Sequence, residues 1–378
     1  MILKAFLALV RAGLWEKEAQ LLPFGEVNYE EVMRLAEEQS VVGLVAAGLG
    51  HVSDVKVPKE ELLQFVGLSL RLEQQNKDMN VFLANLVEKM RSAGIYTLLV
   101  KGQGVAQCYE KPLWRACGDI DLLLDEENYN RAKERIAPIA DEVASENEKN
   151  KHQAYVIRGF DVELHGGMPF RMAERVDKEI DEVMKDCFIG GNVSSWEDGD
   201  TTVFVPVPGN HIIFVFTHFL HHFYIEGVGL RQICDWCRLL WTYREELDVC
   251  LLEKRIRKMG LMTEWQAFYN LASRYLGMPD LGSGLMVHDS RFDKKADRIL
   301  ALVLKSGNFG HNKDLSYRSR YSGMTYKIVA AWRRLKDFVS LIPVFPLDAP
   351  RFYVTYVMGK VKEKSREVNE AYSERQTL

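Results

Sequence analysis

The sequence predicts an α+β fold, in which a small α/β unit lies between two helical regions. Three observations predict it: apolar residues recur at helical spacing before residue 94, short β-branched runs follow, and helical spacing returns after residue 206. We therefore expect an N-terminal helical region over 1–93, an α/β unit over 94–206 and a C-terminal helical region over 207–378. A chain of 378 residues is long enough for two or three such units.

The first boundary lies where the hydrophobic period changes. Apolar residues recur at i, i+3, i+4, i+7 and i+11 from Met79 to Met90, which predicts a helix with one buried face. Gly94 is typical of the residue that ends such a helix. Ile95–Val100 is then a short apolar run rich in β-branched and aromatic residues, and it predicts a fully buried strand.

The α/β unit continues with alternating short elements. A short helix is expected from Gly102 to about Glu110, and a second strand over Ile120–Leu124. Asp125 is a suitable N-cap for the helix that follows, because its side chain can accept a backbone N–H. Further strands are expected at 154–158 and 161–165, joined tightly through Gly159, and at 202–205 as an edge strand.

Helical spacing returns after Asn210. Prolines and histidines interrupt the long uncharged stretch from Thr201 to Ile225, so we do not expect it to span a membrane. Helices are expected at about 210–224, 229–245, 250–275, 292–306, 322–338 and 350–373.

The composition is that of a globular protein and excludes several classes. Apolar residues at 47% and charged residues at 27% exclude a wholly disordered or fibrous chain. The net charge of −4 offers no chain-wide basic surface, so nucleic acid is not an expected partner. The six cysteines are dispersed and follow no recognisable signal peptide, which predicts a reducing, cytoplasmic location.

The most informative segment is the acidic strand around Asp119 and Asp121. Side chains alternate along a strand, so these two carboxylates point the same way while their apolar neighbours face the core. Two like charges so placed need a compensating cation, and carboxylate oxygens suit Mg²⁺ or Mn²⁺. The alternative is a strand end in solvent, balanced by Arg115 or Lys111.

Two further features favour the metal interpretation. Lys101-Gly102-Gln103-Gly104 follows a strand and opens a helix, so free backbone N–H groups and a lysine can hold phosphate, although no Walker A motif is present. A plain strand-to-helix turn is the alternative. Glu163 lies on a later strand between apolar residues and can supply a third carboxylate, unless it is exposed and paired with Arg158.

Together these segments resemble a known family. The resemblance covers the chain from about Leu98 to Gly310. It is carried by Lys101-Gly102, Tyr109, Pro112, Arg115, Gly118-Asp119-Ile120-Asp121-Leu122-Leu123 and Val162-Glu163-Leu164-His165, with Gly229–Trp236 and Ser306–Gly310 as further similar segments. The family is the uncharacterised nucleotidyltransferase family of the DNA polymerase β-like superfamily.

The resemblance implies a minimal nucleotidyltransferase fold, which is a small mixed sheet with packed helices. It also implies that Asp119 and Asp121 bind metal and that Glu163 is the third carboxylate. The superfamily's phosphate-binding turn usually reads Gly-Ser, whereas this chain has Gly102-Gln103. Phosphate contact is therefore expected from the backbone N–H groups, Gln103 and Lys101.

Three more residues are candidate nucleotide contacts. His165 shares the strand face of Glu163 and can reach the same cleft. Arg115 lies within the family motif, and Arg231 stands at a predicted helix start, where it can contact phosphate or another part of the chain.

The helix near residues 211–222 carries four histidines whose role the sequence leaves open. His218 and His222 are four residues apart and share a face, which can bind zinc, but the glutamate of the metalloprotease motif is missing. Packing in the core and contact with a nucleotide or acceptor are the other two interpretations. Cys234 and Cys237 have the spacing of a redox or zinc motif, but no second pair accompanies them, which favours core thiols.

We therefore expect a metal-dependent nucleotidyltransferase that moves NMP from an NTP to a hydroxyl of a small molecule or a protein. One alternative is a nucleotide-binding or regulatory protein that keeps the fold without turnover. Another is a zinc hydrolase built on the histidine-rich helix. Neither the acceptor, the preferred base nor the oligomeric state follows from the sequence.

Overall fold

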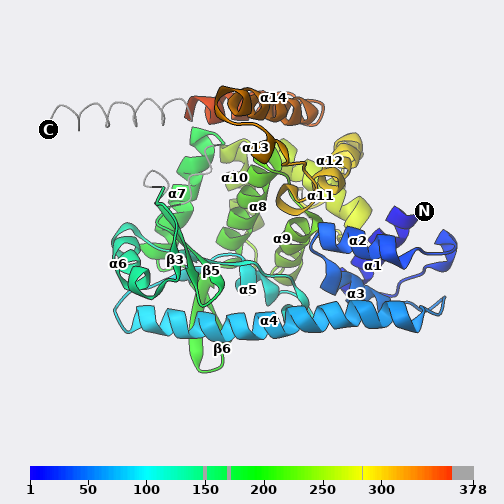
Figure 1. Ribbon diagram of the computed structural model, residues 1–378, viewed down its shortest axis with the longest axis horizontal. Coiled ribbons are helices and arrows are strands. Elements are labelled where there is room, and N and C mark those ends of the chain that lie inside the picture. The colour runs from blue at the N-terminus through cyan, green and yellow to red at the C-terminus, as the bar shows by residue number, and fades with distance from the viewer. Residues whose placement is uncertain (148–150, 168–171, 283, 360–378) are drawn as a thin grey trace.

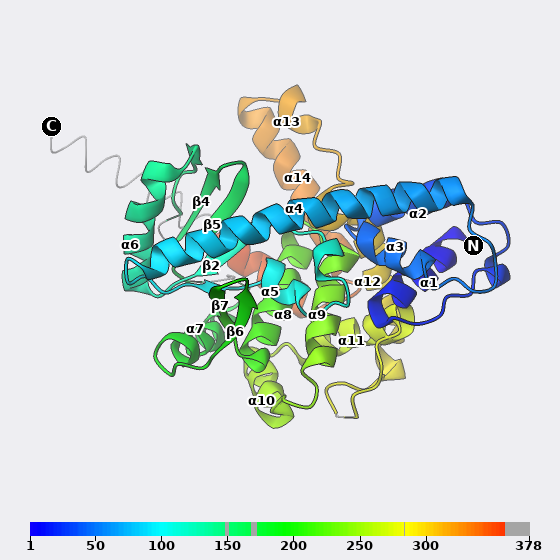
Figure 2. The ribbon, with the colours of Figure 1, turned by 90° about the horizontal axis from the view of Figure 1, so that it is seen from below.

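The structure is a computed structural model, and it describes residues 1–147, 151–167, 172–282 and 284–359. It confirms the α+β class: a mixed sheet lies toward one end of a long helix, α4 (Lys59–Arg91), and helices gather over the rest (Figure 1). Seen from below, α4 crosses the molecule from the sheet to the N-terminal helices (Figure 2). Acidic residues in its first turn and basic residues in its last turn suit the helix dipole.

The main sheet has five strands in the order β1-β2-β5-β4-β3. β2 and β5 are parallel, and the other neighbouring pairs are antiparallel. The predicted strands are confirmed with small shifts, except that the run at 95–100 pairs over only two residues. The bounds are β1 Leu98–Leu99, β2 Asp119–Leu123, β3 Glu142–Val143, β4 His152–Ile157 and β5 Phe160–His165.

The strand predicted at 202–205 is present, but it lies in a separate two-stranded sheet. β7 (Thr201–Pro206) pairs with β6 (Val193–Asp198), which the sequence analysis did not predict, and not with the main sheet. Asp125 does cap the next helix, since its Oδ1 accepts the N–H of Asn128 at 2.7 Å. The helices of this region are α5 Gly102–Ala106, α6 Glu126–Ile136 and the unpredicted α7 Glu174–Phe188.

The N-terminal and C-terminal helices share one hydrophobic cluster, which runs from Ala5 to Phe352. A second cluster joins the later half of α4 to the sheet and α6. The expected division at residues 93 and 206 stays a prediction. The N-terminal helices are α1 Ile2–Trp15, α2 Tyr29–Glu38 and α3 Val42–Leu49.

The single helix expected at 250–275 is two helices, because the chain turns at Gly260 with a φ of 65°. Residues 348–359 are helical, and the rest of the helix expected at 350–373 lies outside the described residues. The other C-terminal bounds are α8 Pro208–Ile225, α9 Leu230–Thr242, α10 Val249–Met259, α11 Met262–Leu276, α12 Asp293–Ser306, α13 Tyr317–Arg320 and α14 Gly323–Leu341.

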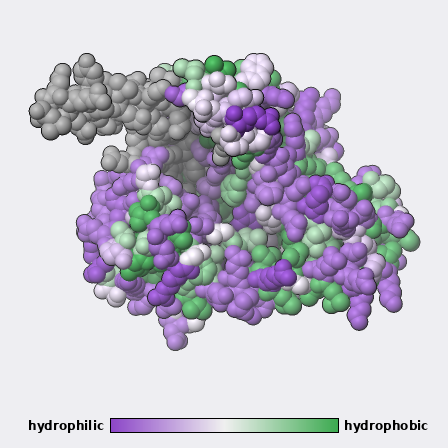
Figure 3. All heavy atoms as spheres, in the orientation of Figure 1, coloured by the Kyte–Doolittle hydropathy of each residue, from purple (hydrophilic) through white to green (hydrophobic). Residues whose placement is uncertain are grey.

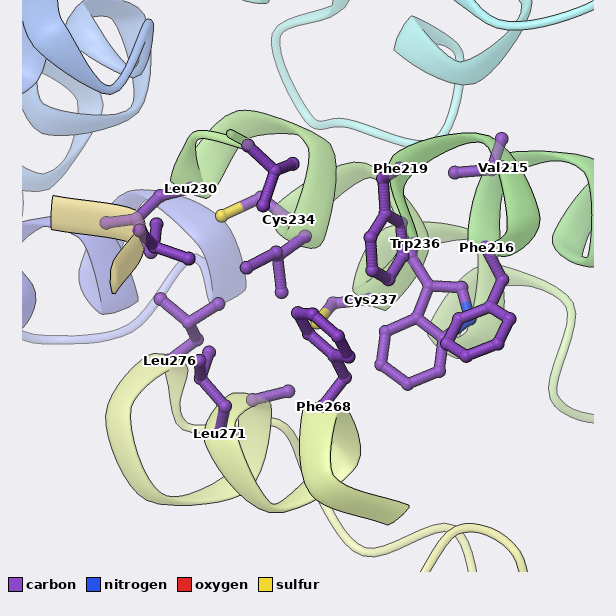
Figure 4. Packing of buried hydrophobic residues seen from close by; sticks show 14 of the residues in the cluster. Val215, Phe216, Phe219, Leu230, Cys234, Trp236, Cys237, Phe268, Leu271 and Leu276 are labelled. Atoms are coloured by element: carbon purple, nitrogen blue, oxygen red, sulfur yellow. The ribbon is translucent and has the colours of Figure 1, made fainter. Parts of the chain in front are cut away.

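The centre of the helical cluster is built from α8, α9 and α11 (Figure 4). Trp236 packs against Phe216 and Trp265, with ring centroids 5.6 and 4.8 Å apart. Cys234 and Cys237 lie in this core as free, fully buried thiols. Burial raises the pKa of both thiols, so they are core residues and not reactive thiolates.

Glu264 is a fully buried acid in the same helical region, and replacing its carboxyl group with an uncharged amide is expected to stabilise the fold. Tyr224 donates to its Oε1 at 3.0 Å, and its Oε2 has no partner in the described chain. Burial raises the pKa of Glu264 to about 7. Because the folded pKa exceeds the unfolded one, wild-type stability should fall as pH rises from about 4.5 to about 7.

At pH 8 the free energy of unfolding of Glu264→Gln should therefore exceed that of the wild type by about 2–3 kcal/mol. The decrease in stability between pH 4.5 and pH 7 should be smaller in this variant, because glutamine does not ionise in that range. Urea denaturation at pH 5 and pH 8 measures both effects. A variant less stable than the wild type at pH 8 would contradict the assignment.

The face shown in Figure 3 is mainly hydrophilic, with hydrophobic side chains in separate patches, one of them at the upper edge over α14. On α14, Met324, Ile328 and Trp332 are exposed. Within the described residues, no helix combines the length and apolarity needed to cross a bilayer.

Candidate active site

Three carboxylates from two neighbouring strands gather on one face of the sheet. Asp119 and Asp121 alternate along β2 with fully buried apolar residues. Their side chains therefore point to the face of the sheet opposite the one that these apolar residues cover. The parallel register of β2 and β5 places Asp121 directly beside Glu163. One carboxylate oxygen from each of the three acids lies within 4.8 Å of the other two. The structure thus brings together the three acids selected from the sequence.

Asp121 has an unpaired oxygen in a buried position. Its side chain is 1% exposed, and its Oδ1 accepts from Lys101 Nζ at 2.6 Å and from His165 Nε2 at 2.9 Å. Its Oδ2 has no hydrogen-bond partner in the described part of the chain. A buried oxygen left without a partner is costly, and a cation among the three acids would satisfy it. The residues therefore fit a hard divalent cation such as Mg²⁺ or Mn²⁺.

The surroundings push the pKa values of the acids apart. The charge of Asp121, together with burial, raises the pKa of Asp119. Burial also acts to raise the pKa of Asp121, but Lys101 and His165 outweigh it and hold that pKa below its usual value. For Glu163, burial is likewise outweighed by hydrogen bonds from His152 and His165, and its pKa falls. Asp119 is thus the acid that gains most from a nearby cation.

Lys101 reaches Asp121 from a strained backbone. Its φ is 90°, a value that residues with a side chain rarely adopt and that costs on the order of 1–3 kcal/mol. Gly102 follows with a φ of 48°, and a Cβ there would lie 3.4 Å from the Asp119 carbonyl oxygen. Burial acts to lower the pKa of Lys101, but Asp121 and Asp119 raise it, so the ammonium stays charged.

Gln103 follows Gly102 at the start of α5. It is 2% exposed, and neither atom of its side-chain amide has a hydrogen-bond partner among the described residues. Its helix, α5, is only five residues long. The turn therefore contains a buried amide without a hydrogen-bond partner among the described residues.

Five of the nine candidate residues line one narrow pocket, which Phe309 and Asp235 also border. The five are Lys101, Gly102, Arg115, Asp119 and Arg231.

The two arginines of this pocket have different partners. Arg115 forms a buried two-point ion pair with Asp235 of α9, with Nε–Oδ1 at 3.0 Å and Nη2–Oδ2 at 2.6 Å. Arg231 donates from Nη1 to the Ala116 carbonyl at 2.8 Å, while its Nε has no partner in the described chain. Arg231 is thus better placed than Arg115 to receive an anion, and the sequence analysis could not distinguish them.

The histidines of α8 lie against the site and not in a separate metal centre. Lys101 Nζ lies 3.0 Å from His218 Nε2, which lies 3.2 Å from His222 Nε2. His211 accepts the backbone N–H of Lys101 at 3.5 Å. Burial lowers the pKa of His211 to about 4 and that of His218 well below its usual value, so both are neutral near pH 7. A metal ion between His218 and His222 would face the Lys101 ammonium.

His152 is a further residue of the site that the sequence pattern did not predict. It lies on β4 directly opposite His165, and its Nε2 is 3.1 Å from Glu163 Oε2. The two-residue turn at Arg158-Gly159 sets this register, because it pairs Ile157 with Phe160. Each residue further back along β4 then pairs with one further along β5, which places His152 opposite His165. Counting back from that turn would have found His152.

Acids from parallel strands beside a lysine and a glycine-led turn are the arrangement expected of a phosphoryl-transfer site. The chain belongs to a family described as uncharacterised nucleotidyltransferase, whose model matches residues 25–277, more than half of the 378 residues. The match confirms the resemblance, although it begins well before Leu98 and ends before Gly310. No curated protein and no solved structure matches the chain.

Proposed function

We propose that the protein transfers an NMP group from an NTP to a hydroxyl of a small molecule or a protein, in a reaction that depends on Mg²⁺ or Mn²⁺. Membership of the nucleotidyltransferase family supports the reaction class. The observation that carries the proposal is the convergence of Asp119, Asp121 and Glu163, with one buried oxygen of Asp121 left unpaired. These three acids would hold the cation.

When bound, the cation supplies positive charge against the triphosphate and lowers the pKa of the attacking hydroxyl. The remaining roles belong to the chain itself. Lys101 brings a second positive charge to the same place, and Arg231 offers an unpaired N–H in the pocket that both line. The strain at Lys101 is consistent with such a role, because strained backbone tends to occur at functional sites.

His165 and Arg115 would act by positioning other residues, His165 through Asp121 and Arg115 through Asp235. His165 donates to Asp121 and lies 3.4 Å from Glu163, so it holds two of the acids in place. Arg115 ties the segment before β2 to α9 through Asp235. Gly102 and Gln103 supply the start of α5, and Gly102 lines the pocket. The amide of Gln103 is 2% exposed and would have to turn toward a phosphate to contact it.

A larger cavity offers a place for the acceptor. It has a volume of about 870 Å³ and is lined by parts of α8, α12 and α14, including Lys305 and Arg334. Phe309 lines both this cavity and the narrow pocket at Lys101, so the two are neighbours. A molecule bound in the cavity would reach the acids from the side of Phe309.

The alternative is a protein that binds nucleotide without turnover. Gly102-Gln103 in place of Gly-Ser favours this alternative. The ion pair between Lys101 and Asp121 favours it too, because the ammonium already neutralises a carboxylate that would bind the metal.

We also propose an intracellular location, which the six free thiols support.

Titration calorimetry with each NTP, in Mg²⁺ and again in EDTA, tests the proposal. We expect binding that requires the metal, followed by transfer of label from α-phosphate-labelled NTP to a species in a cell extract. Binding without transfer to any species would favour the alternative. Absence of NTP binding in both Mg²⁺ and Mn²⁺ would contradict the proposed function.

A further inference from the structure

Two histidines converge on one oxygen of Glu163. His152 of β4 stands opposite His165 of β5, and their ring centroids are 4.8 Å apart. Glu163 is two residues before His165 and so shares its face of the sheet. Its Oε2 lies 3.1 Å from His152 Nε2 and 3.4 Å from His165 Nε2.

We propose that His152, His165 and Glu163 bind a divalent transition metal ion such as Zn²⁺. This second metal site lies next to the Asp119–Asp121–Glu163 cluster, and Glu163 belongs to both. Two imidazoles and one carboxylate are ligands that zinc and its neighbours prefer, whereas Mg²⁺ prefers oxygen alone. Three protein ligands leave a position open to water or substrate. The site does not depend on the proposed nucleotidyl transfer.

The spacing of the three ligand atoms suits such an ion. Ligands at about 2.0–2.1 Å from a tetrahedral metal lie about 3.3–3.4 Å from one another. The two nitrogen–oxygen distances of 3.1 and 3.4 Å are close to this separation, and all three atoms lie within 4.8 Å of one another.

Charge and access also favour this site. Zinc binding replaces the hydrogen bond between His165 Nε2 and Asp121 Oδ1, which lie 2.9 Å apart, because that nitrogen must lose its proton to ligate the ion. Asp121, which is 1% exposed and has an unpaired Oδ2, then adds buried negative charge beside the ion. His152 is 33% exposed and Glu163 30%, so an ion can enter from solvent. The other close histidine pair, His218 and His222, is disfavoured because the Lys101 ammonium lies 3.0 Å from His218 Nε2.

Zinc affinity and the visible absorption of Co²⁺-loaded protein test the site without an activity measurement. We expect the full chain to bind stoichiometric Zn²⁺ after dialysis, and to give a Co²⁺ spectrum of a site with imidazole and carboxylate ligands. His152→Ala should weaken zinc binding by about 100-fold or more, beyond the ~10–100-fold typical of changes outside the ligand shell. Its thermal melt should stay close to that of the wild type, because His152 is partly exposed.

Three variants locate the ion. Asp119→Asn should weaken zinc binding far less than His152→Ala does, since Asp119 belongs only to the acidic cluster. His222→Ala, on the histidine-rich helix, should keep the zinc affinity of the wild type. His288→Ala is a matched control, because His288 also contacts a carboxylate, Asp293 at 2.9 Å, but lies elsewhere. Wild-type protein without zinc, wild-type affinity in His152→Ala, or loss in His222→Ala would overturn the proposal, whether or not the chain binds NTP.

Discussion

Asp121→Asn is expected to abolish nucleotidyl transfer while the protein stays folded. Asparagine keeps the shape and an acceptor oxygen for Lys101 and His165, which donate to Asp121 at 2.6 and 2.9 Å. It removes the negative charge that would hold the cation. A metal ion supplies several kcal/mol of transition-state stabilisation, so turnover should fall by about 10³-fold or more. Initial rates with labelled NTP, read with the melting temperature, measure the effect.

The matched control is Asp200→Asn. Asp200 is an exposed aspartate in the turn between β6 and β7, outside the acidic cluster. Its substitution should change neither turnover nor stability. Metal-dependent NTP binding should weaken in Asp121→Asn and persist in Asp200→Asn. A folded Asp121→Asn variant with wild-type turnover would remove the metal assignment and with it the proposed mechanism.

The acidic strand was predictable because its signal is local. Asp119 and Asp121 alternate with apolar residues, and this pattern fixes both the strand and the face that the acids share. The pairing of β2 with β5 is different, because two strands some forty residues apart meet through tertiary packing that alternation does not encode. The sequence therefore proposed Glu163 as a third acid but could not show that it lies beside Asp121.

Other features could not be predicted from the sequence, and each has a specific reason. His152 escaped notice because the strand was expected to begin at Ala154, two residues after its true start. The break at Gly260 was hidden by continuous helical spacing on both sides. The ion pair of Arg115 with Asp235 did not follow from the sequence either, because the two residues are 120 positions apart, and the nucleotide contact expected of Arg115 stays a prediction.

The ion pair of Arg115 and Asp235 leads to the largest stability effect we expect. Both side chains are 5% exposed, and Tyr109 also donates to Asp235, at 2.8 Å. Burial acts to lower the pKa of Arg115, but Asp235 raises it well above its usual value, so the guanidinium stays charged. Asp235→Ala leaves that charge buried without a counter-charge and should lower the free energy of unfolding by about 3–5 kcal/mol.

Urea denaturation of three variants separates this effect from a general loss of packing. Glu174→Ala removes an acid that pairs with Lys178 on the surface, and its stability should stay close to that of the wild type. The double variant Arg115→Met/Asp235→Leu should recover most of the loss, because no buried charge remains unpaired. If Asp235→Ala were no more destabilising than Glu174→Ala, the pair would not anchor α9 to the segment before β2. Arg115 would then be free to contact a nucleotide, as the sequence first suggested.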